Sequence, residues 1–205
     1  MELKVAIETR TSVRQYLPEA IDIKDIKEMV RLASLAPSVN NYQPWKFIAI
    51  TNKEMLSSMA NLIRRKILAL PDNDSRFSVN IKNQVEFFAT FFEQAPVLIA
   101  ICMDSYETVL EKGVTLSHEE INIMRNSPDI QSTGACIQNL LLAAVDMGYG
   151  ACWMSAPMVA SEDLGKMIDI KDSSKLISFV AVGKPLKPVK PREKKPIDDM
   201  FRVIE

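Results

Sequence analysis

The apolar run Val97–Met103 constrains the fold more than any other stretch of this sequence. It reads VLIAICM, follows Ala95-Pro96, and contains no polar residue. Its length suits a strand, and continuous rather than alternating apolarity predicts a strand that is covered on both faces. The chain is therefore expected to place further layers on both sides of a central sheet.

Helical patterns elsewhere can supply those layers. The sequence predicts helices at Glu2–Glu8, Ile23–Leu35, Lys53–Leu70, Val79–Glu93, Gln131–Met147 and about Ser161–Ile168. Further strands are expected at Phe47–Ile50 and Leu176–Val182. Because four helices precede the second clear strand, regular βαβ alternation is disfavoured and an α+β three-layer arrangement is predicted.

Two residues mark helix ends. Asp22 suits the N-cap of the second helix, and Gly148 suits the position after the helix Gln131–Met147. That helix has few polar positions, so it is expected to be buried nearly all round.

Composition bounds the class of protein. The chain has 205 residues, 47% hydrophobic and 25% charged, which fits one globular domain. The net charge of −1 argues against a general nucleic-acid or membrane-surface binder. No apolar run approaches the roughly 18 residues of a membrane span, and Met1–Glu8 lacks the core of a secretory signal. A cytoplasmic protein is expected.

Metal and nucleophile chemistry find little support in the sequence. Cys102, Cys136 and Cys152 have apolar neighbours and form no CxxC pair, so they are expected to be reduced core thiols. The single histidine, His118, lies among charged residues and is expected on a solvated surface. We therefore predict neither a metal site nor a catalytic histidine.

The segment Ala36–Phe47 combines Pro, Ser, Asn and Gln and cannot continue a helix. Ser38, Asn41 and Gln43 offer groups that donate and accept hydrogen bonds. They suit a ligand such as a heterocycle edge or a ribityl chain. The alternative is a simple helix-to-strand connector that Trp45 anchors in the core.

Arg10, Ser12 and Arg14 alternate along a short segment. In an extended backbone these three side chains share one face, and two guanidiniums beside a hydroxyl form a good anion site. The alternative is a solvated basic turn.

Two other stretches are less specific. Phe87, Phe88, Phe91 and Phe92 lack interleaved basic residues, so they indicate core or a subunit interface rather than a base-stacking surface. The weakly patterned segment Asp104–Asp129 suits a lid or a substrate-specific insertion.

The tail, Lys184–Glu205, carries four prolines and seven cations against four acids. Strand pairing within the chain is not expected over Pro185–Pro196. We expect residues 1–183 to form the domain and residues 184–205 to extend it. A free tail is the simplest expectation, but the apolar end suggests docking on a second subunit: Met200, Phe201, Val203, Ile204.

Four motifs together resemble the nitroreductase family of FMN-dependent oxidoreductases. They occur in the family's order and span almost the whole chain: Arg10–Tyr16; Ala36–Ser38 through Gln43–Phe47; Ile137–Ala144 with Gly148–Trp153; and Gly183–Pro185 with the basic tail. The resemblance implies an α+β sandwich with a mostly antiparallel central sheet. It also implies an interlocked homodimer that binds FMN at its interface, with terminal segments reaching across to the partner.

The resemblance also assigns the FMN-binding residues. It implies a first segment that contacts the flavin, a loop offered by the other subunit, a backbone beside the isoalloxazine and two late cations on the phosphate. The first segment is Arg10, Thr11, Ser12 and Arg14, and the loop from the other subunit is Pro37, Ser38 and Asn41. The backbone beside the isoalloxazine is that of Ser155 and Ala156, and the late cations are Arg192 and Lys194.

The implied chemistry needs no catalytic side chain. Hydride passes from NADH or NADPH through flavin N5 to a small acceptor, such as a nitroaromatic or a quinone, by a ping-pong mechanism. Arg14 is the candidate cation at the N1/C2 edge, where reduction builds negative charge. A further family contact could come from Asn80, Lys82 or Asn83. Tyr106, Glu107 and Lys112 do not fit the order of the dehalogenase branch.

Other readings stay open at this point. The chain could be a flavin-binding carrier or sensor without turnover, or belong to a dehalogenase or flavin-fragmenting branch. It could also be a structural protein without flavin, in which the Arg and Asn loops are surface turns.

Overall fold

The computed structural model describes residues 1–73 and 75–204 of the chain. A four-stranded sheet forms its centre, with the order β1-β2-β4-β3 and only antiparallel neighbours. The strands are β1 Trp45–Ile50, β2 Val97–Asp104, β3 Gly150–Met154 and β4 Ser174–Gly183. The predicted α+β class with an antiparallel sheet is confirmed.

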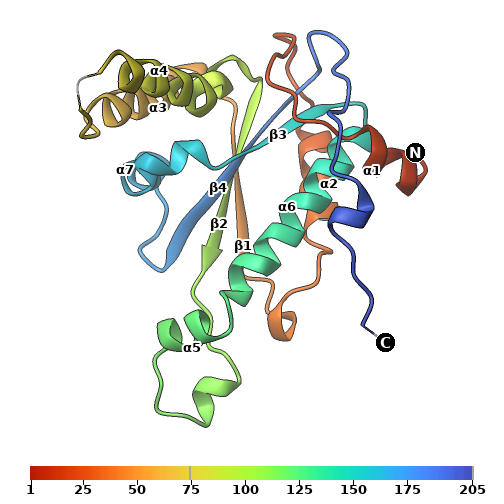
Figure 1. The fold of residues 1–205 in the computed structure, drawn as a ribbon, viewed down its shortest axis with the longest axis vertical. Coiled ribbons are helices and arrows are strands. Elements are labelled where there is room, and N and C mark those ends of the chain that lie inside the picture. Colours follow the sequence, from red (N-terminus) through yellow and green to blue (C-terminus); the bar gives the residue numbers. More distant parts are fainter. Residues whose placement is uncertain (74, 205) are drawn as a thin grey trace.

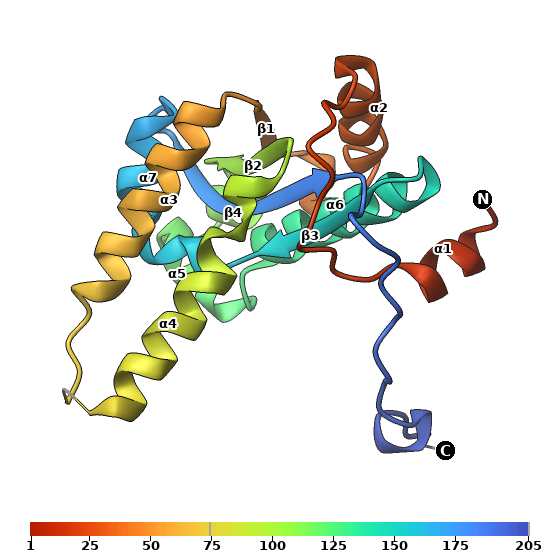
Figure 2. The same cartoon turned by 90° about the horizontal axis from the view of Figure 1, so that it is seen from above.

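Helices cover both faces of the sheet (Figures 1 and 2). One face carries α2 Ile23–Ala33 and α6 Pro128–Asp146, and α1 Leu3–Thr9 packs on the outer side of α6. The other face carries α3 Lys53–Leu68, α4 Arg76–Thr90 and α7 Ser161–Met167. The short helix α5 His118–Met124 lies beyond one end of the sheet (Figure 1).

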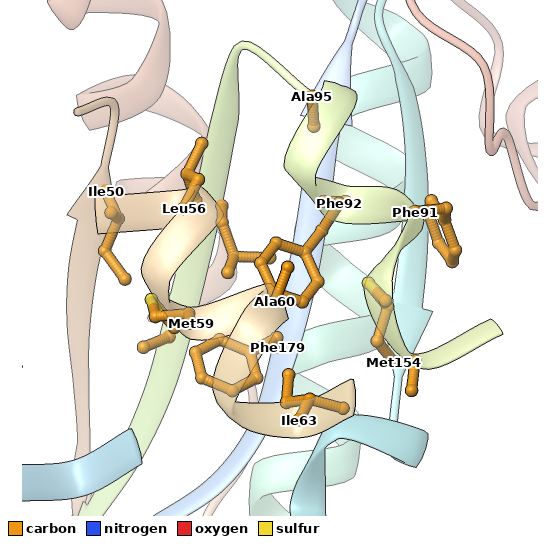
Figure 3. Packing of buried hydrophobic residues seen from close by; sticks show 14 of the residues in the cluster. Ile50, Leu56, Met59, Ala60, Ile63, Phe91, Phe92, Ala95, Met154 and Phe179 are labelled. Atoms are coloured by element: carbon orange, nitrogen blue, oxygen red, sulfur yellow. The ribbon is translucent and has the colours of Figure 1, made fainter. Parts of the chain in front are cut away.

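Strand β2 is inner in the sheet and is buried from Val97 to Met103, as its sequence predicts. Between the sheet and α3, the side chains of Leu56, Met59 and Ile63 are completely buried (Figure 3). Phe92 stacks on Phe179 of β4, with ring centroids 6.4 Å apart. Each such side chain contributes about 1.5–3 kcal/mol by leaving water, so this cluster fixes α3 on the sheet.

Local signals place two helix ends. The Asp22 carboxylate accepts the Lys24 N–H at 2.8 Å and caps α2. Gly148 adopts a φ of +80°, and the N–H groups of Gly148 and Tyr149 donate to carbonyls of the last turn of α6. A glycine suits this left-handed position because it has no Cβ to strain the backbone.

Four expectations need correction. Strand β3 was not predicted, because its Gly, Ala and Cys residues carry little strand propensity. Helix α5 forms inside the weakly patterned segment, where Ser117 and Glu120 build a capping box. One strand-like bridge joins Pro185 to Tyr16, where none was expected within the chain.

The fourth correction concerns α6. It is buried on the side that faces the sheet, but Gln131, Gln138 and Asp146 are exposed on the other. Its exposed polar residues therefore lie on the side away from the sheet, and the helix is not buried nearly all round.

Gly150 sets how closely the segment after α1 approaches β3. A Cβ at this position would lie 2.5 Å from Val13 Cγ2. We expect Gly150→Ala to destabilise the fold by about 1–3 kcal/mol, because side chains that are forced together shift the backbone. Urea unfolding of the purified protein measures this loss.

Gly113→Ala is the matched control, since its nearest neighbour atom would lie 3.9 Å away. Equal unfolding midpoints for the two variants would show that the close approach of Val13 to Gly150 does not constrain the fold.

Candidate functional site

The segment that follows α1 is fixed along the outer edge of β3. Ser12 and Ala151 form a parallel bridge, in which the Val13 N–H donates to the Ala151 carbonyl at 3.1 Å. The buried Tyr16 hydroxyl donates to the Val13 carbonyl at 2.6 Å. These contacts hold an extended backbone, so the predicted alternation of side chains along this segment has a rigid support.

The segment and the C-terminal tail together line one cleft of about 530 Å³. Figure 2 shows the blue tail passing beside the red segment that follows α1. The cleft contains six of the eleven predicted cofactor residues: Arg10, Thr11, Ser12, Arg14, Arg192 and Lys194. Lys190 adds a fifth cation, and Glu8 is the one acid in the lining. The cleft therefore attracts anions.

Arg14 is held between the segment and α4. Its guanidinium carbon lies 5.4 Å from the centre of the Phe88 ring, and its Nη1 donates weakly to the Ser12 carbonyl at 3.5 Å. Burial raises the pKa of the nearby Cys152 thiol, and the positive charges of Arg14 and Arg10 oppose that rise. The thiol stays protonated at neutral pH and is not a nucleophile here.

Ser155 and Ala156 follow β3 directly and begin a 3-10 turn, Ala156–Ala160. Strand β3 is an edge strand, and beyond its bridge to Ser12 no strand of residues 1–73 and 75–204 pairs with its outer side. Backbone donors and acceptors along this edge can therefore reach a ligand. At about 3.3 Å per residue, Ser155 lies about 13 Å from the Ser12 bridge.

The loop with Pro37, Ser38 and Asn41 lies elsewhere. It enters the sheet where the Pro44 carbonyl accepts the Asp104 N–H at 2.8 Å, next to Ser174 at the start of β4. The cleft lies at the other end of β4, about 25 Å along the strand. One chain does not bring this loop to the cleft.

The loop is internally ordered. Ser38 Oγ accepts the Gln43 N–H at 2.9 Å, and the Val39 N–H donates to Ser132 Oγ at 3.2 Å. Three non-glycine residues have a positive φ near 50°: Asn40, Asn41 and Gln43. Trp45 is buried at the end of the loop, as the connector alternative expects.

The three residues of α4 that were candidates for a further cofactor contact, Asn80, Lys82 and Asn83, differ in their surroundings. The Lys82 ammonium pairs with Asp72 and donates to the Leu68 and Leu70 carbonyls, so it ties α3 to α4. Asn80 and Asn83 are exposed on α4. The aromatic group divides: Phe91 and Phe92 are buried, whereas Phe87 and Phe88 are largely exposed.

Sequence reasoning missed a second cleft, of about 470 Å³, between α5, the start of α6 and the start of β4. His118 lines it, partly buried rather than on a solvated surface. Its Nδ1 lies 2.8 Å from Glu111 Oε1, and its Nε2 lies 2.8 Å from Asn122 Nδ2. The spacing of Ser117 and Glu120 was the one sequence signal for the helix that carries it.

Glu111 fixes the histidine. Hydrogen bonds from His118 and the Thr108 N–H lower the pKa of the Glu111 carboxyl from its usual 4.5 to about 2. The ionised carboxylate can only accept, so His118 Nδ1 carries the proton, and Nε2 accepts from Asn122. With both ring nitrogens engaged, His118 has a structural role in this cleft.

Tyr106 is buried in the same cluster, with its ring 5.2 Å from His118, and its hydroxyl has no hydrogen-bond partner among the described residues. We expect Tyr106→Phe to stabilise the protein by about 1 kcal/mol, because an unsatisfied buried hydroxyl costs about 1–3 kcal/mol. Urea unfolding at neutral pH measures the change.

Tyr42→Phe serves as the control, since Tyr42 belongs to the same aromatic cluster but is half exposed. A loss of stability in Tyr106→Phe would show that this hydroxyl is bonded in solution.

Comparison with known proteins agrees with this architecture. A model described as the Nitroreductase family matches residues 7–184. An Archaeoglobus fulgidus protein with the provisional name NADH dehydrogenase/NAD(P)H nitroreductase is 26% identical over 181 residues, 87% of this chain and 83% of that protein. The 5,6-dimethylbenzimidazole synthase of Rhodospirillum rubrum is 22% identical over 98% of this chain and 87% of its own.

Solved structures share the whole fold. The crystal structure of a BluB-like flavoprotein from Clostridium difficile 630 covers both chains completely, with a TM-score of 0.88 and 26% identity. A nitroreductase with bound FMN from Desulfitobacterium hafniense covers 100% of this chain and 99% of its own, with a TM-score of 0.74 and 18% identity. None of the helices in residues 1–73 and 75–204 combines the length and apolar character that crossing a membrane requires.

Proposed function

The chain belongs to the nitroreductase family, whose model matches residues 7–184, and from this premise we propose that it is an FMN-dependent NAD(P)H oxidoreductase. Its acceptor would be a small molecule such as a nitroaromatic or a quinone. The observation that carries the proposal is the basic cleft that the segment after α1 forms with the tail.

The cleft suits the FMN phosphate. A phosphate monoester is close to dianionic at neutral pH, and guanidinium groups bind it with two parallel hydrogen bonds. Arg10, Arg192 and Lys194 would hold this group, with the Thr11 and Ser12 hydroxyls as additional donors.

The edge of β3 suits the rest of the cofactor. An elongated ligand with its phosphate in the cleft can follow this edge toward Ser155 and Ala156. Unpaired backbone N–H and carbonyl groups there match a heterocycle edge that both donates and accepts.

When bound, FMN supplies at N5 a position that accepts and donates hydride. This chain contributes binding and electrostatics. Arg14 would place a fixed positive charge at the N1/C2 edge and favour the reduced flavin. The protonated Cys152 thiol takes no part in the hydride transfer. Nor does His118, whose two ring nitrogens are both hydrogen-bonded.

The proposed site needs a second copy of the chain. Pro37, Ser38 and Asn41 lie about 25 Å along the sheet from the cleft, so the partner's loop would complete the flavin pocket. The second cleft, with Tyr106 and His118, lies on the segment Asp104–Asp129, which we propose contributes to the choice of acceptor.

The tail gives a physical reason for a homodimer. Its apolar end is exposed in the single chain: Met200, Phe201, Val203 and Ile204. Strand β1 is the other edge of the sheet, and a groove of about 680 Å³ beside it carries Ile48, Ile50 and Met55. We propose that residues 184–205 extend the domain of residues 1–183 onto the partner, where such a groove can receive the apolar end.

An absorption spectrum of the purified protein tests the function. We expect flavin bands near ~450 nm that bleach on anaerobic addition of NADH or NADPH and return when a quinone is added. Bands that neither nucleotide bleaches would favour the carrier without turnover, and an absence of binding after added FMN would reject the cofactor.

Matched lysine variants test the cleft. Lys194→Ala should weaken FMN binding about tenfold, because it removes a charge-assisted hydrogen bond. Lys187→Ala removes an exposed lysine of the same tail outside the cleft lining and should leave the affinity unchanged.

Ending the chain after Pro196 tests the dimer. This deletion keeps Arg192 and Lys194 but removes the apolar end, so we expect a monomer that binds FMN weakly. Light scattering after size-exclusion chromatography measures the assembly. Asp198→Ala in the full chain keeps the apolar residues and should remain dimeric; a dimeric truncated protein would contradict the docking of the tail.

A second candidate is the flavin-fragmenting branch, which the BluB-like structure and the synthase relative favour. Chromatography of the products after the reduced protein is exposed to oxygen distinguishes the two. A benzimidazole product would support fragmentation, and intact FMN would support simple electron transfer.

A further inference from the structure

Helix α4 approaches the proposed flavin site through one aromatic ring. Phe88 lies near the C-terminal end of α4, and the Arg14 guanidinium carbon lies over its ring, 5.4 Å from the centroid. This distance is within the range of a cation–π contact. Phe88 does not line the basic cleft, so the ring acts on the cleft only through Arg14.

Arg14 has little else in the chain to hold it. Its hydrogen bond to the Ser12 carbonyl is long at 3.5 Å, and no acid forms an ion pair with it among the described residues. An arginine side chain loses substantial rotamer freedom when it is fixed. The Phe88 ring is therefore a contact that restricts the guanidinium without pairing its charge.

The contact with Phe88 leaves the charge of the guanidinium intact, because a phenyl ring carries no negative charge of its own. The five N–H donors of arginine radiate in the plane of the group, whereas the π face carries no donor. The Phe88 ring restricts the position of the group and is not a hydrogen-bonding anion that would pair with those donors. A carboxylate partner would consume those donors and neutralise the charge.

Phe88 has a neighbouring ring on the same helix that offers a matched control. It packs against Phe87 with ring centroids 5.3 Å apart and an angle of 76° between the planes. Both rings stand on α4, one position apart, and both are largely exposed, at 55% for Phe87 and 40% for Phe88. Of these two rings, Phe88 is the one that makes the cation–π contact with the guanidinium.

We propose that Phe88 is a positioning residue for the proposed flavin site, because its ring holds the Arg14 guanidinium in place without neutralising its positive charge. The inference rests on the proposed FMN function. A fixed cation stabilises the anionic, reduced flavin more than the oxidised one, so Phe88 raises the midpoint potential of the bound flavin.

The test uses the full-length, FMN-loaded protein. We expect Phe88→Leu to weaken the binding of reduced FMN about two- to fivefold more than that of oxidised FMN, the scale of an exposed cation–π contact. For a two-electron couple this difference lowers the midpoint potential by about 10–20 mV. A redox titration against dyes and an FMN binding titration measure these quantities.

Three further variants separate positioning from packing. Phe87→Leu removes the neighbouring ring and should leave the potential unchanged. Phe88→Trp keeps a π face and should restore it. In an Arg14→Ala background, Phe88→Leu should have no additional effect, because the ring then has no cation to position.

The outcomes are distinguishable. A wild-type potential in Phe88→Leu, with a lowered one in Arg14→Ala, would overturn the role of Phe88 and leave the proposed function standing. An equal loss in Phe87→Leu would likewise overturn it, since helix packing would then explain the effect. A protein that binds no FMN would instead reject the proposed function.

Discussion

The burial of β2 on both faces is the constraint on which the rest of the structure depends. A strand without a polar face requires a layer on each side, and α3 with α4 and α2 with α6 provide them. Only the two edges of the sheet then stay open to other groups. The segment after α1 joins the edge at β3, and the basic cleft forms there rather than over a sheet face.

Much of the fold could be predicted from the sequence, because the signals are local. Leu56, Met59 and Ile63 have helical spacing in the sequence and form the buried side of α3. Asp22 and Gly148 marked helix ends by their own backbone chemistry. Strand β3 escaped prediction because tertiary pairing with β4 overrides its weak propensity. The setting of His118 escaped for a related reason: Glu111 and Asn122 reach it only after α5 forms.

The candidate site could be predicted in part. Alternation along an extended segment places Arg10, Ser12 and Arg14 together, so local geometry was sufficient for that part of the cleft. The tail joins them through a long-range contact that only the order of the family's motifs indicated. No sequence spacing reveals that the loop with Ser38 lies at the far end of β4. Sequence spacing also does not reveal the contact of Arg14 with Phe88 of α4, because the two residues lie far apart in the chain.

The loop after α2 has a consequence for how this protein can change over time. Three residues that are not glycine have left-handed backbone in this loop: Asn40, Asn41 and Gln43. The conformational free energy that this backbone costs is part of the free energy of folding, so it is not added when a ligand binds. A ligand that meets the loop therefore meets a surface that is already shaped. The left-handed backbone also restricts which residues these three positions accept. β-Branched residues are disfavoured there, whereas asparagine, aspartate and glycine can replace one another. New ligand preferences would arise more readily on α5 itself, where none of the residues His118–Met124 holds left-handed backbone.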